Sequence, residues 1–226
     1  MSAEGADAAG LPPAPEVVQI EVGLLQNFCE ILYCPETRVA AIVDPAWEVD
    51  RLLRETERLG VKVEIALITH THEDHIEGVG ELVAKTGATV IVNPREAERV
   101  RGAARTLADA IDGRDVAIGR RGVRALETRG HTVGGTCYLA DGWVVTGDVL
   151  FVGGCGRTDF SGGDTAEMWQ SLQRLMRLPE ETRVYPGHNY GDTPTSTIGH
   201  ETLTNPYLRC PTFEDFRALR ERKRKA

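Results

Sequence analysis

The pattern of apolar and polar residues predicts a chain of short strands interrupted by a few helices. Val17–Val22 alternates apolar and polar side chains, as a half-buried strand does, and two further strands are expected at Phe28–Tyr33 and Val39–Val43. Asp44-Pro45 then supplies an N-cap followed by a proline suited to the first helical position, and helical spacing of apolar residues continues until Gly60. These residues predict a small sheet with one face covered by a helix.

The rest of the chain repeats this pattern. A buried strand is expected at Val63–Ile68, and helical spacing follows from Ile76 to Lys85. Asp141-Gly142 is a two-residue turn signal between two strands, and Asp164 is expected to cap a helix. The remaining expected elements are strands at Thr89–Val92, Asp115–Ile118, Val123–Glu127, Thr136–Ala140, Trp143–Thr146 and Arg183–Tyr185, and a closing helix from Thr212. Because both halves run from strands into helices, we expect an α/β fold in which two β-rich halves pack face to face with helices outside.

Composition and charge limit the classes of protein to which the chain can belong. With 226 residues and no segment that looks like an interdomain linker, one domain is expected. Hydrophobic content of 41% and charged content of 27% are typical of a globular protein. The formal net charge of −8 argues against a nucleic-acid-binding surface, which requires a basic footprint. Only Arg217–Lys225 is basic, which is typical of a solvated helix end.

The N-terminal segment and the cysteines bear on the cellular compartment. Residues 1–16 are rich in Ala, Gly and Pro and lack an apolar segment, so we expect a disordered leader there rather than a signal peptide, with the folded domain at 17–226. No apolar run approaches the roughly 18 residues of a membrane span. The five cysteines are widely spaced without a Cys-x-x-Cys pair, which indicates a reducing compartment. We therefore expect a cytoplasmic protein without a membrane or nucleic-acid partner.

The densest group of candidate functional residues lies in the segment 69–75, Thr-His-Thr-His-Glu-Asp-His. His70, His72 and His75 are three of only six histidines, and Asp74 lies among them. The segment follows a buried strand and begins a helix, at the kind of strand end where α/β sheets hold their sites. A polar loop that is rich in histidine by chance is the alternative. One metal ion needs three or four ligands, so a metal site here requires further ligands from elsewhere in the chain.

Three other residues are suitable partners, namely His131, Asp148 and His188. Each stands beside glycine at the end of an apolar β segment. Each is weak alone, because an Asp after Gly is usually a turn former and a lone His at a strand end is usually a surface residue. Together they occupy the kind of position where the histidine-rich segment needs partners. His200 is left over, and we expect a structural or surface role for it.

Four short motifs together resemble those of the metallo-β-lactamase superfamily. They are Thr-His-x-His-x-Asp-His at 69–75, Gly-His-Thr at 130–132, Gly-Asp at 147–148 and Gly-His at 187–188. The resemblance covers nearly all of residues 17–210 and implies a four-layer αββα sandwich in a single domain. Within the superfamily, the chain looks like the glyoxalase II group, especially its short bacterial members. This closer resemblance is carried by the stretches 147–157, 185–190 and 195–201, with Asn205-Pro206.

The resemblance implies a centre of two divalent metal ions, with zinc expected and iron or manganese also suited to the ligands. One ion would take His70, His72 and His131, the other Asp74, His75 and His188, and Asp148 would bridge them. Two dications that share a water lower its pKa from about 15.7 to about 7, which supplies hydroxide at neutral pH. That hydroxide can attack a carbonyl, and Asp74 and Asp148 are the expected catalytic carboxylates. A thioester is a natural substrate, because a thiol with a pKa of about 8.5 leaves easily.

The glyoxalase II resemblance implies cleavage of a hydroxyacylglutathione, typically lactoylglutathione. Arg157 and Tyr190 match positions that contact glutathione in that group, although an ion pair of Arg157 with Asp159 and a packing role for Tyr190 are equally compatible with the sequence. Many members have an aromatic residue where this chain has Asp159. Larger members also carry a C-terminal helical domain with further basic contacts, and we expect this chain to end too soon to hold it. Cys155 is expected to pack in a tight loop rather than act as a nucleophile.

The main alternative is the persulfide dioxygenase family, a near relative with the same fold. Its members hold a single iron (Fe²⁺) with two histidines and one carboxylate, which correspond here to His70, His131 and Asp148. Both families keep all seven ligand positions, so the sequence does not separate a thioester hydrolase from a dioxygenase acting on glutathione persulfide. A lactone or other ester hydrolase, and a non-catalytic or nucleic-acid-processing member, are further alternatives. The complete ligand set argues against a member without activity.

Overall fold

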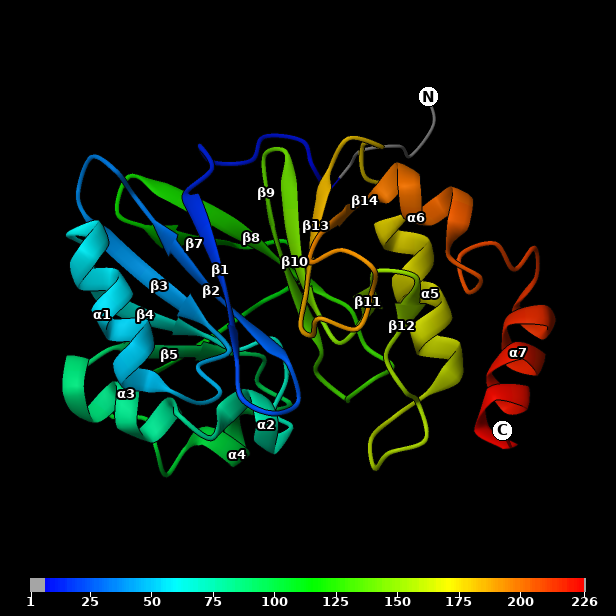
Figure 1. Ribbon diagram of the computed structural model, residues 1–226, viewed down its shortest axis with the longest axis horizontal. Coiled ribbons are helices and arrows are strands. Elements are labelled where there is room, and N and C mark those ends of the chain that lie inside the picture. Colours follow the sequence, from blue (N-terminus) through cyan, green and yellow to red (C-terminus); the bar gives the residue numbers. More distant parts are fainter. Residues whose placement is uncertain (1–6, 226) are drawn as a thin grey trace.

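Two six-stranded sheets form the centre of the computed structural model, which describes residues 7–225 (Figure 1). The first sheet contains, in spatial order, β1 (Glu16–Val22), β2 (Asn27–Tyr33), β3 (Val39–Val43), β4 (Lys62–Leu67), β5 (Thr89–Val92) and β6 (Leu107–Asp109). The second contains β14 (Ser196–Thr197), β13 (Arg183–Pro186), β10 (Trp143–Gly147), β9 (Thr136–Ala140), β8 (Arg121–Glu127) and β7 (Asp115–Ile118). A separate hairpin pairs β11 (Leu150–Phe151) with β12 (Gly154–Cys155).

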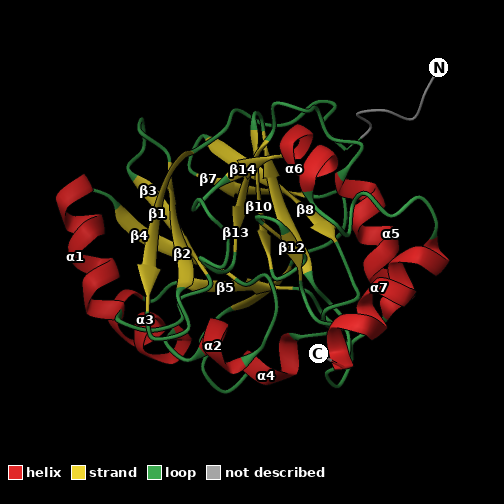
Figure 2. Ribbon diagram, turned by 45° about the vertical axis from the view of Figure 1, so that its right-hand side comes forward, coloured by secondary structure: helices red, strands yellow, loops and turns green. Residues whose placement is uncertain are grey.

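Helices cover the outer face of each sheet, as Figures 1 and 2 show. The first half of the chain contributes α1 (Val49–Leu59), α2 (Glu73–Ile76), α3 (Val79–Thr86) and α4 (Ala97–Val100), and the second contributes α5 (Thr165–Leu175), α6 (Ile198–Thr204) and α7 (Phe213–Lys225). One apolar core lies between the first sheet and α1 and α3, and another between the second sheet and α5, α6 and α7. The predicted four-layer αββα sandwich is confirmed.

A third apolar core holds the two sheets together. It contains Leu32, Val43 and Leu67 from the first sheet and Ala125 and Val145 from the second. Burying these side chains on both inner faces stabilises the sandwich by the hydrophobic effect. Tyr138 of β9 is fully buried in the same layer, and its hydroxyl donates a hydrogen bond of 2.8 Å to the carbonyl of Ile68, just after β4. This bond joins the sheets at the point where the histidine-rich segment begins.

Two details of the predicted helices were wrong. Asp44 does not cap α1, which begins only at Val49 with Glu48 at the N-cap position; Asp44 is instead buried, with a left-handed φ of 43°. Its carboxylate accepts a hydrogen bond from the backbone N–H of Thr69, and this long-range partner replaces the local one. The single helix expected from Ile76 to Lys85 is divided into α2 and α3 around Gly78. A Cβ at Gly78 would lie 2.7 Å from the carbonyl oxygen of Pro45. The two backbone segments are therefore too close there for any residue but glycine.

The described part of the expected leader, residues 7–15, follows the second half of the fold. The Asp7 carboxylate pairs with Arg174 of α5 through two contacts of 2.7 Å, and Arg124 donates to the carbonyls of Asp7 and Ala9. Leu11 packs against the core beneath α5. The structure therefore differs from the expected disorder in this range, because two arginines distant in sequence supply partners. Residues 1–6 of the expected leader lie outside the described residues.

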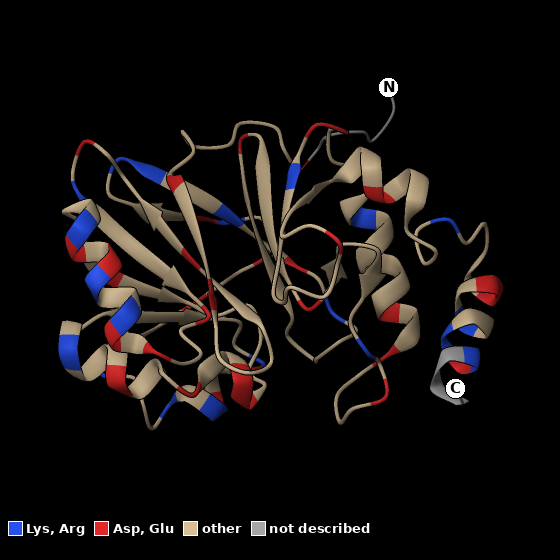
Figure 3. Ribbon diagram, viewed as in Figure 1, with Lys and Arg blue, Asp and Glu red and all other residues tan. Residues whose placement is uncertain are grey.

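The outer helices α1 and α3 carry acidic and basic residues side by side, and Figure 3 shows no large surface of one charge on them. Among residues 7–225, no helix has both the length and the apolar character required to cross a membrane.

The packing of α7 generates a stability prediction. Phe216 is fully buried, with its ring centre 5.3 Å from that of Trp169 and 6.0 Å from that of Tyr207. We expect Phe216→Ala to lower the free energy of unfolding by about 3–5 kcal/mol, because it leaves a cavity beneath the helix. Urea denaturation measures this change. Arg222→Ala on the exposed side of α7 is the control, with an expected change within about 0.5 kcal/mol. A loss below about 1 kcal/mol for Phe216→Ala would contradict the prediction.

Candidate metal centre

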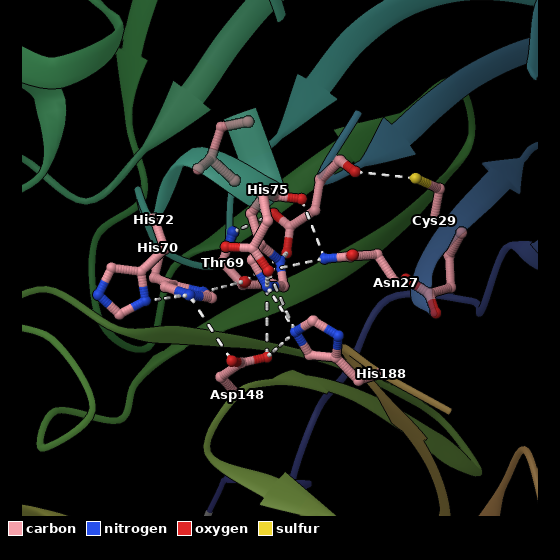
Figure 4. A network of polar contacts seen from close by, with 12 residues as sticks. Asn27, Cys29, Thr69, His70, His72, His75, Asp148 and His188 are labelled. Atoms are coloured by element: carbon pink, nitrogen blue, oxygen red, sulfur yellow. Dashed lines mark hydrogen bonds and ion pairs between the residues drawn. The ribbon is translucent and has the colours of Figure 1, made fainter. Parts of the chain in front are cut away.

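Four strand ends meet at one edge of the interface between the sheets. The predicted residues follow these strands, with His70, His72, Asp74 and His75 after β4, His131 after β8, Asp148 after β10 and His188 after β13. Figure 4 shows His70 and His75, from one segment, turned toward Asp148 and His188, which come from two others. A cavity of 770 Å³, called the central cavity below, opens over this edge and is lined by His72, Asp74, His131, Asp148 and His188, among others.

Three histidines form the first group of candidate ligands. The Nδ1 atom of His72 lies 3.1 Å from Nε2 of His70 and 2.9 Å from Nε2 of His131. One nitrogen from each ring lies within 4.8 Å of the other two. His70 and His131 are buried, whereas His72 is half-buried and lines the central cavity. The three rings therefore present nitrogens to a common point, as the ligands of a single metal ion do.

A second group contains Asp74, His75 and His188. The Nε2 atoms of the two histidines lie 3.2 Å apart. Oδ2 of Asp74 lies 3.4 Å from Nε2 of His188 and 3.6 Å from Nε2 of His75. Both histidines are buried, while the Asp74 side chain is 23% exposed. This group combines two nitrogens with a carboxylate oxygen.

Asp148 lies between the two groups and offers one oxygen to each. Oδ2 lies 3.4 Å from Nε2 of His131 and 4.0 Å from Nε2 of His70. Oδ1 lies 3.4 Å from Nε2 of His75 and 3.5 Å from Nε2 of His188. A carboxylate with its oxygens divided in this way can bridge two cations.

Hydrogen bonds on the outer side of two rings fix which nitrogen carries the proton. Nδ1 of His131 donates to the carbonyl of Arg157 at 2.7 Å, and Nδ1 of His188 donates to the carbonyl of Leu25 at 2.9 Å. A carbonyl only accepts, so in each neutral ring the proton lies on Nδ1 and the lone pair of Nε2 points inward. Outer partners of this kind are typical of metal-binding histidines.

The inner atoms of both groups fit a cation. Nitrogen lone pairs that face each other at 2.9–3.2 Å repel in the neutral state. Oδ1 of Asp148 is buried and makes no hydrogen bond. A dication at each group would satisfy these atoms, because imidazole nitrogen and carboxylate oxygen both bind Zn²⁺, Fe²⁺ and Mn²⁺. The donor set of this chain therefore fits two divalent metal ions.

Sequence reasoning missed two residues that position the second group. The Asp44 carboxylate lies 2.9 Å from Nδ1 of His75, on the side away from the central cavity. The side-chain amide of Asn27, at the start of β2, donates to the Asp74 backbone carbonyl at 2.9 Å and to its Oδ2 at 3.1 Å. Asp44 forms a cluster with His70 and His75, but it faces the outer nitrogen of His75 and so supports the ring rather than completing the ligand set. The available sequence signal was a carboxylate directly after a buried strand, which we interpreted as an N-cap.

Burial keeps the first group neutral. Removal from water lowers the pKa of His70 well below its usual value and lowers that of His72 to about 4. It also lowers the pKa of His131, against an opposing effect of the Asp148 carboxylate. Neutral imidazoles are the form that binds a metal, so these rings are ready to act as ligands at neutral pH.

In the second group, nearby carboxylates raise the pKa values of the histidines although burial alone would lower them. Burial alone would lower the pKa of His188, but its contacts with Asp148 and Asp74 outweigh burial and raise the pKa to about 9. For His75, burial is likewise outweighed by Asp148 and Asp44, which raise the pKa well above its usual value. Burial would raise the pKa of Asp148, yet the neighbouring His75 holds it well below the usual range. Protons on the two histidines thus balance the carboxylates in the metal-free protein.

Arg157 and Tyr190 both line the central cavity. The Arg157 guanidinium binds both oxygens of Asp159, at 2.9 and 2.8 Å, and lies 4.2 Å above the ring of Phe160. Tyr190 stacks on the ring of His188, with centroids 4.5 Å apart, and is 56% exposed. Arg157 therefore makes the ion pair that the sequence left as an alternative, and both side chains also face the space where a substrate would lie.

Two other predicted residues lie outside the ligand groups. Cys155 is buried in the wall of the central cavity, 3.5 Å from Nη1 of Arg220. His200 is exposed at the start of α6, and its backbone N–H donates to Oγ1 of Thr197. Neither belongs to the clusters of candidate ligands among the described residues.

The family model of the metallo-beta-lactamase superfamily matches residues 31–188 of this chain. The chain belongs to the metallo-beta-lactamase superfamily. It is 33% identical to PksB of Bacillus subtilis, named a probable polyketide biosynthesis zinc-dependent hydrolase, over 87% of this chain and 88% of that protein. It is 37% identical to a hydroxyacylglutathione hydrolase of Rhodospirillum rubrum over 77% of this chain and 66% of that protein. Among solved structures, ETHE1 of Myxococcus xanthus is similar, with a TM-score of 0.83, 34% identity and coverage of 91% of this chain and 90% of that one.

The carboxylate behind His75 generates a prediction for metal binding. We expect Asp44→Asn to lower the metal affinity of the second group by about 10- to 100-fold. The neutral amide lacks the negative charge with which the Asp44 carboxylate holds the proton of His75 on Nδ1 and leaves Nε2 free to bind a metal. The ion at the first group should change much less. Competition with a chelator measures both affinities. Asp50→Asn on α1 is the matched control, since the Asp50 side chain is exposed and pairs with Lys85 away from the site. Equal affinities in wild type and Asp44→Asn would contradict the positioning role.

Metal loading is also expected to release protons. At pH 7 the metal-free protein carries protons on His75 and His188, whose pKa values are raised, and each must leave before its Nε2 can bind a metal. We expect release of about two protons per chain at pH 7, and fewer once the pH passes the His188 pKa of about 9. Calorimetric titration in buffers of different ionisation enthalpy counts them. A count near zero at pH 7 would contradict this charge balance.

Proposed function

We propose that the protein is a metal-dependent hydrolase that cleaves the thioester of a small-molecule thiol. The position of Asp148 carries the proposal, since its two oxygens are divided between two buried groups of candidate ligands. The second group offers two nitrogens and a carboxylate oxygen to a second ion, and a cation there would offset the cost of burying these residues. Two adjacent ions are the arrangement used for metal-assisted hydrolysis.

In this proposal His70, His72 and His131 would hold the first ion, Asp74, His75 and His188 would hold the second, and Asp148 would offer one oxygen to each. Zinc is the proposed metal, in keeping with the name of the Bacillus subtilis relative. Such ions, when bound, supply hydroxide at neutral pH and stabilise the negative charge that develops on a carbonyl oxygen.

Asp74 and Asp148 have different proposed catalytic roles. Asp148 is the more enclosed, with 11% of its side chain exposed, and it fixes the spacing of the two groups. Asp74 is 23% exposed, so it can accept a hydrogen bond from a water in the central cavity and aim that water at the carbonyl carbon. His188 and Asn27 contact Oδ2 of Asp74 and keep its pKa low despite burial, which suits orientation better than proton storage.

A hydroxyacylglutathione, or a related conjugate of a small thiol, is the proposed substrate class. Arg157 and Tyr190 would contact it, because both line the central cavity beside the candidate ligands. A thiolate is a good leaving group and does not need a strong general acid. Neither Asp74 nor Asp148 therefore has to donate a proton in the proposed reaction. No two of the five cysteines form a disulfide, as in proteins of reducing compartments, and a cytoplasmic location is part of the proposal.

A persulfide dioxygenase is the second candidate. It is favoured by the group of His70, His131 and Asp148, a two-histidine, one-carboxylate set suited to iron. Elemental analysis of the isolated protein, with assays of lactoylglutathione cleavage and of oxygen uptake with glutathione persulfide, distinguishes the two. About two zinc ions per chain with thioester turnover supports the hydrolase, whereas one iron with oxygen consumption overturns it.

Substitutions in the second group test the two-ion proposal directly. We expect Asp74→Ala and His188→Ala each to reduce thioester hydrolysis by about 1,000-fold or more, because each empties part of the second ion's ligand set. Steady-state kinetics, with metal content measured on the same samples, reports the loss. His200→Ala is the control with wild-type activity, since His200 lies outside the site. Full activity in Asp74→Ala or His188→Ala would indicate a single-ion mechanism.

A further inference from the structure

A second cavity, of 720 Å³, lies beside the central cavity at the inner side of α7. Cys155 and Arg157 line both cavities, so the two share one wall. We call the second one the α7 cavity. Each of the two volumes falls in the range that holds a small-molecule ligand. A molecule that occupied both would be considerably longer than the group that reacts at the candidate metal centre.

Arginines give the α7 cavity its chemical character. Arg217 and Arg220 lie one turn apart on α7 and both line it. Arg220 is half-buried, and its guanidinium donates to Sγ of Cys155 at 3.5 Å and lies 5.4 Å from the ring centre of Tyr207. Neither partner is an anion. These two positive charges are held at the cavity without an ion pair to any described carboxylate.

The acidic residues of this cavity do not cancel the two charges. Asp159 is bound by Arg157 through both oxygens. Glu221 is exposed to solvent and forms no ion pair within the described residues. The hydroxyls of Thr158 and Thr165, 2.8 Å apart, add neutral hydrogen-bonding groups to the wall. An anion that entered would therefore meet two guanidinium groups whose charges are available to it.

The arginines are presented on a fixed element. Phe216, directly before Arg217 in the sequence, is fully buried against Trp169 and Tyr207 and anchors α7 to the core. A helix held in this way fixes the points from which the side chains of Arg217 and Arg220 extend toward the cavity. Guanidinium groups in a fixed arrangement suit phosphate, which they bind through paired N–H···O contacts.

We propose that the α7 cavity binds the phosphate monoester at the far end of a thiol carrier whose acylated sulfur lies in the central cavity. This inference rests on the proposed thioester hydrolysis and names the carrier class. Charge complementarity favours phosphate, since a monoester carries about −1.5 to −2 at pH 7 and meets two unpaired arginines. The separate second cavity favours a carrier with a long arm. A phosphorylated pantetheine thiol has both features.

A matched pair of substrates tests the proposal. S-acetyl-4′-phosphopantetheine and S-acetylpantetheine differ only in the phosphate. The wild-type enzyme should favour the first in kcat/KM by about 10- to 100-fold, through KM, given the strength of charge-assisted hydrogen bonds. Arg217→Ala/Arg220→Ala should abolish the preference, by lowering kcat/KM for the phosphorylated substrate to that for S-acetylpantetheine. The double Lys variant should keep part of the preference, and Arg222→Ala, outside the cavity lining, should keep all of it.

Calorimetric binding to the full-length protein separates this proposal from the proposed function. We expect 4′-phosphopantetheine to bind at least about tenfold more tightly than pantetheine, with the difference lost in the double Ala variant. Equal binding of the two, or arginine-dependent binding of glutathione in preference to 4′-phosphopantetheine, would overturn the proposal. If no thioester is hydrolysed while phosphate-dependent binding persists, the hydrolase proposal fails and the α7 cavity stands as an anion site.

Discussion

Contact between five imidazole rings and two carboxylates at the seam of the sheets imposes an electrostatic constraint on the rest of the molecule. Their inner atoms lie too close together to be stable without protons or cations between them, and they are largely removed from water. The protein holds them there by occupying their outer atoms. Two carbonyls, from Leu25 and Arg157, and the Asp44 carboxylate each accept from, or pair with, the far nitrogen of a ring. The geometry is therefore set before any ion binds.

The two sheets supply the rigid frame that this constraint requires. Backbone hydrogen bonds join them at the site, from Thr136 to Thr69 at 2.8 Å and from Phe28 to Gly187 at 2.8 Å. A residue other than glycine does not fit at position 187, because its Cβ would lie 2.5 Å from Oδ1 of Asp148. The two ligand groups nevertheless differ in charge. The first group consists of neutral rings. The second lies among carboxylates, whose negative charge raises the pKa of His188 and would attract a metal cation in the same way.

The wall between the two cavities links the candidate metal centre to α7. It is carried by the β11–β12 hairpin and the residues after it. Glu201 of α6 is buried and accepts a hydrogen bond from the Gly153 N–H at 2.9 Å, while the Asn205 side chain donates to the Gly154 carbonyl at 3.0 Å. These contacts fix the turn that precedes Cys155 and Arg157. The position of the shared wall thus depends on α6, and the arginines beyond it depend on the anchoring of α7.

Sequence alone indicated most of the strands, the residue types of the candidate ligands and the family, but not the short strands β6, β11, β12 and β14. Alternation of side chains and glycine beside histidine or aspartate are local properties, and local conformational preference is enough to place them. Only the tertiary structure decided that Asp44 supports His75, 31 residues away, and that Asp7 pairs with Arg174, 167 residues away. It also decided that α7 brings Arg217 and Arg220 to a cavity, although the sequence indicated only a solvated helix end. A buried charged or polar group takes whichever partner the packing provides, and the spacing of residues along the chain does not encode that choice.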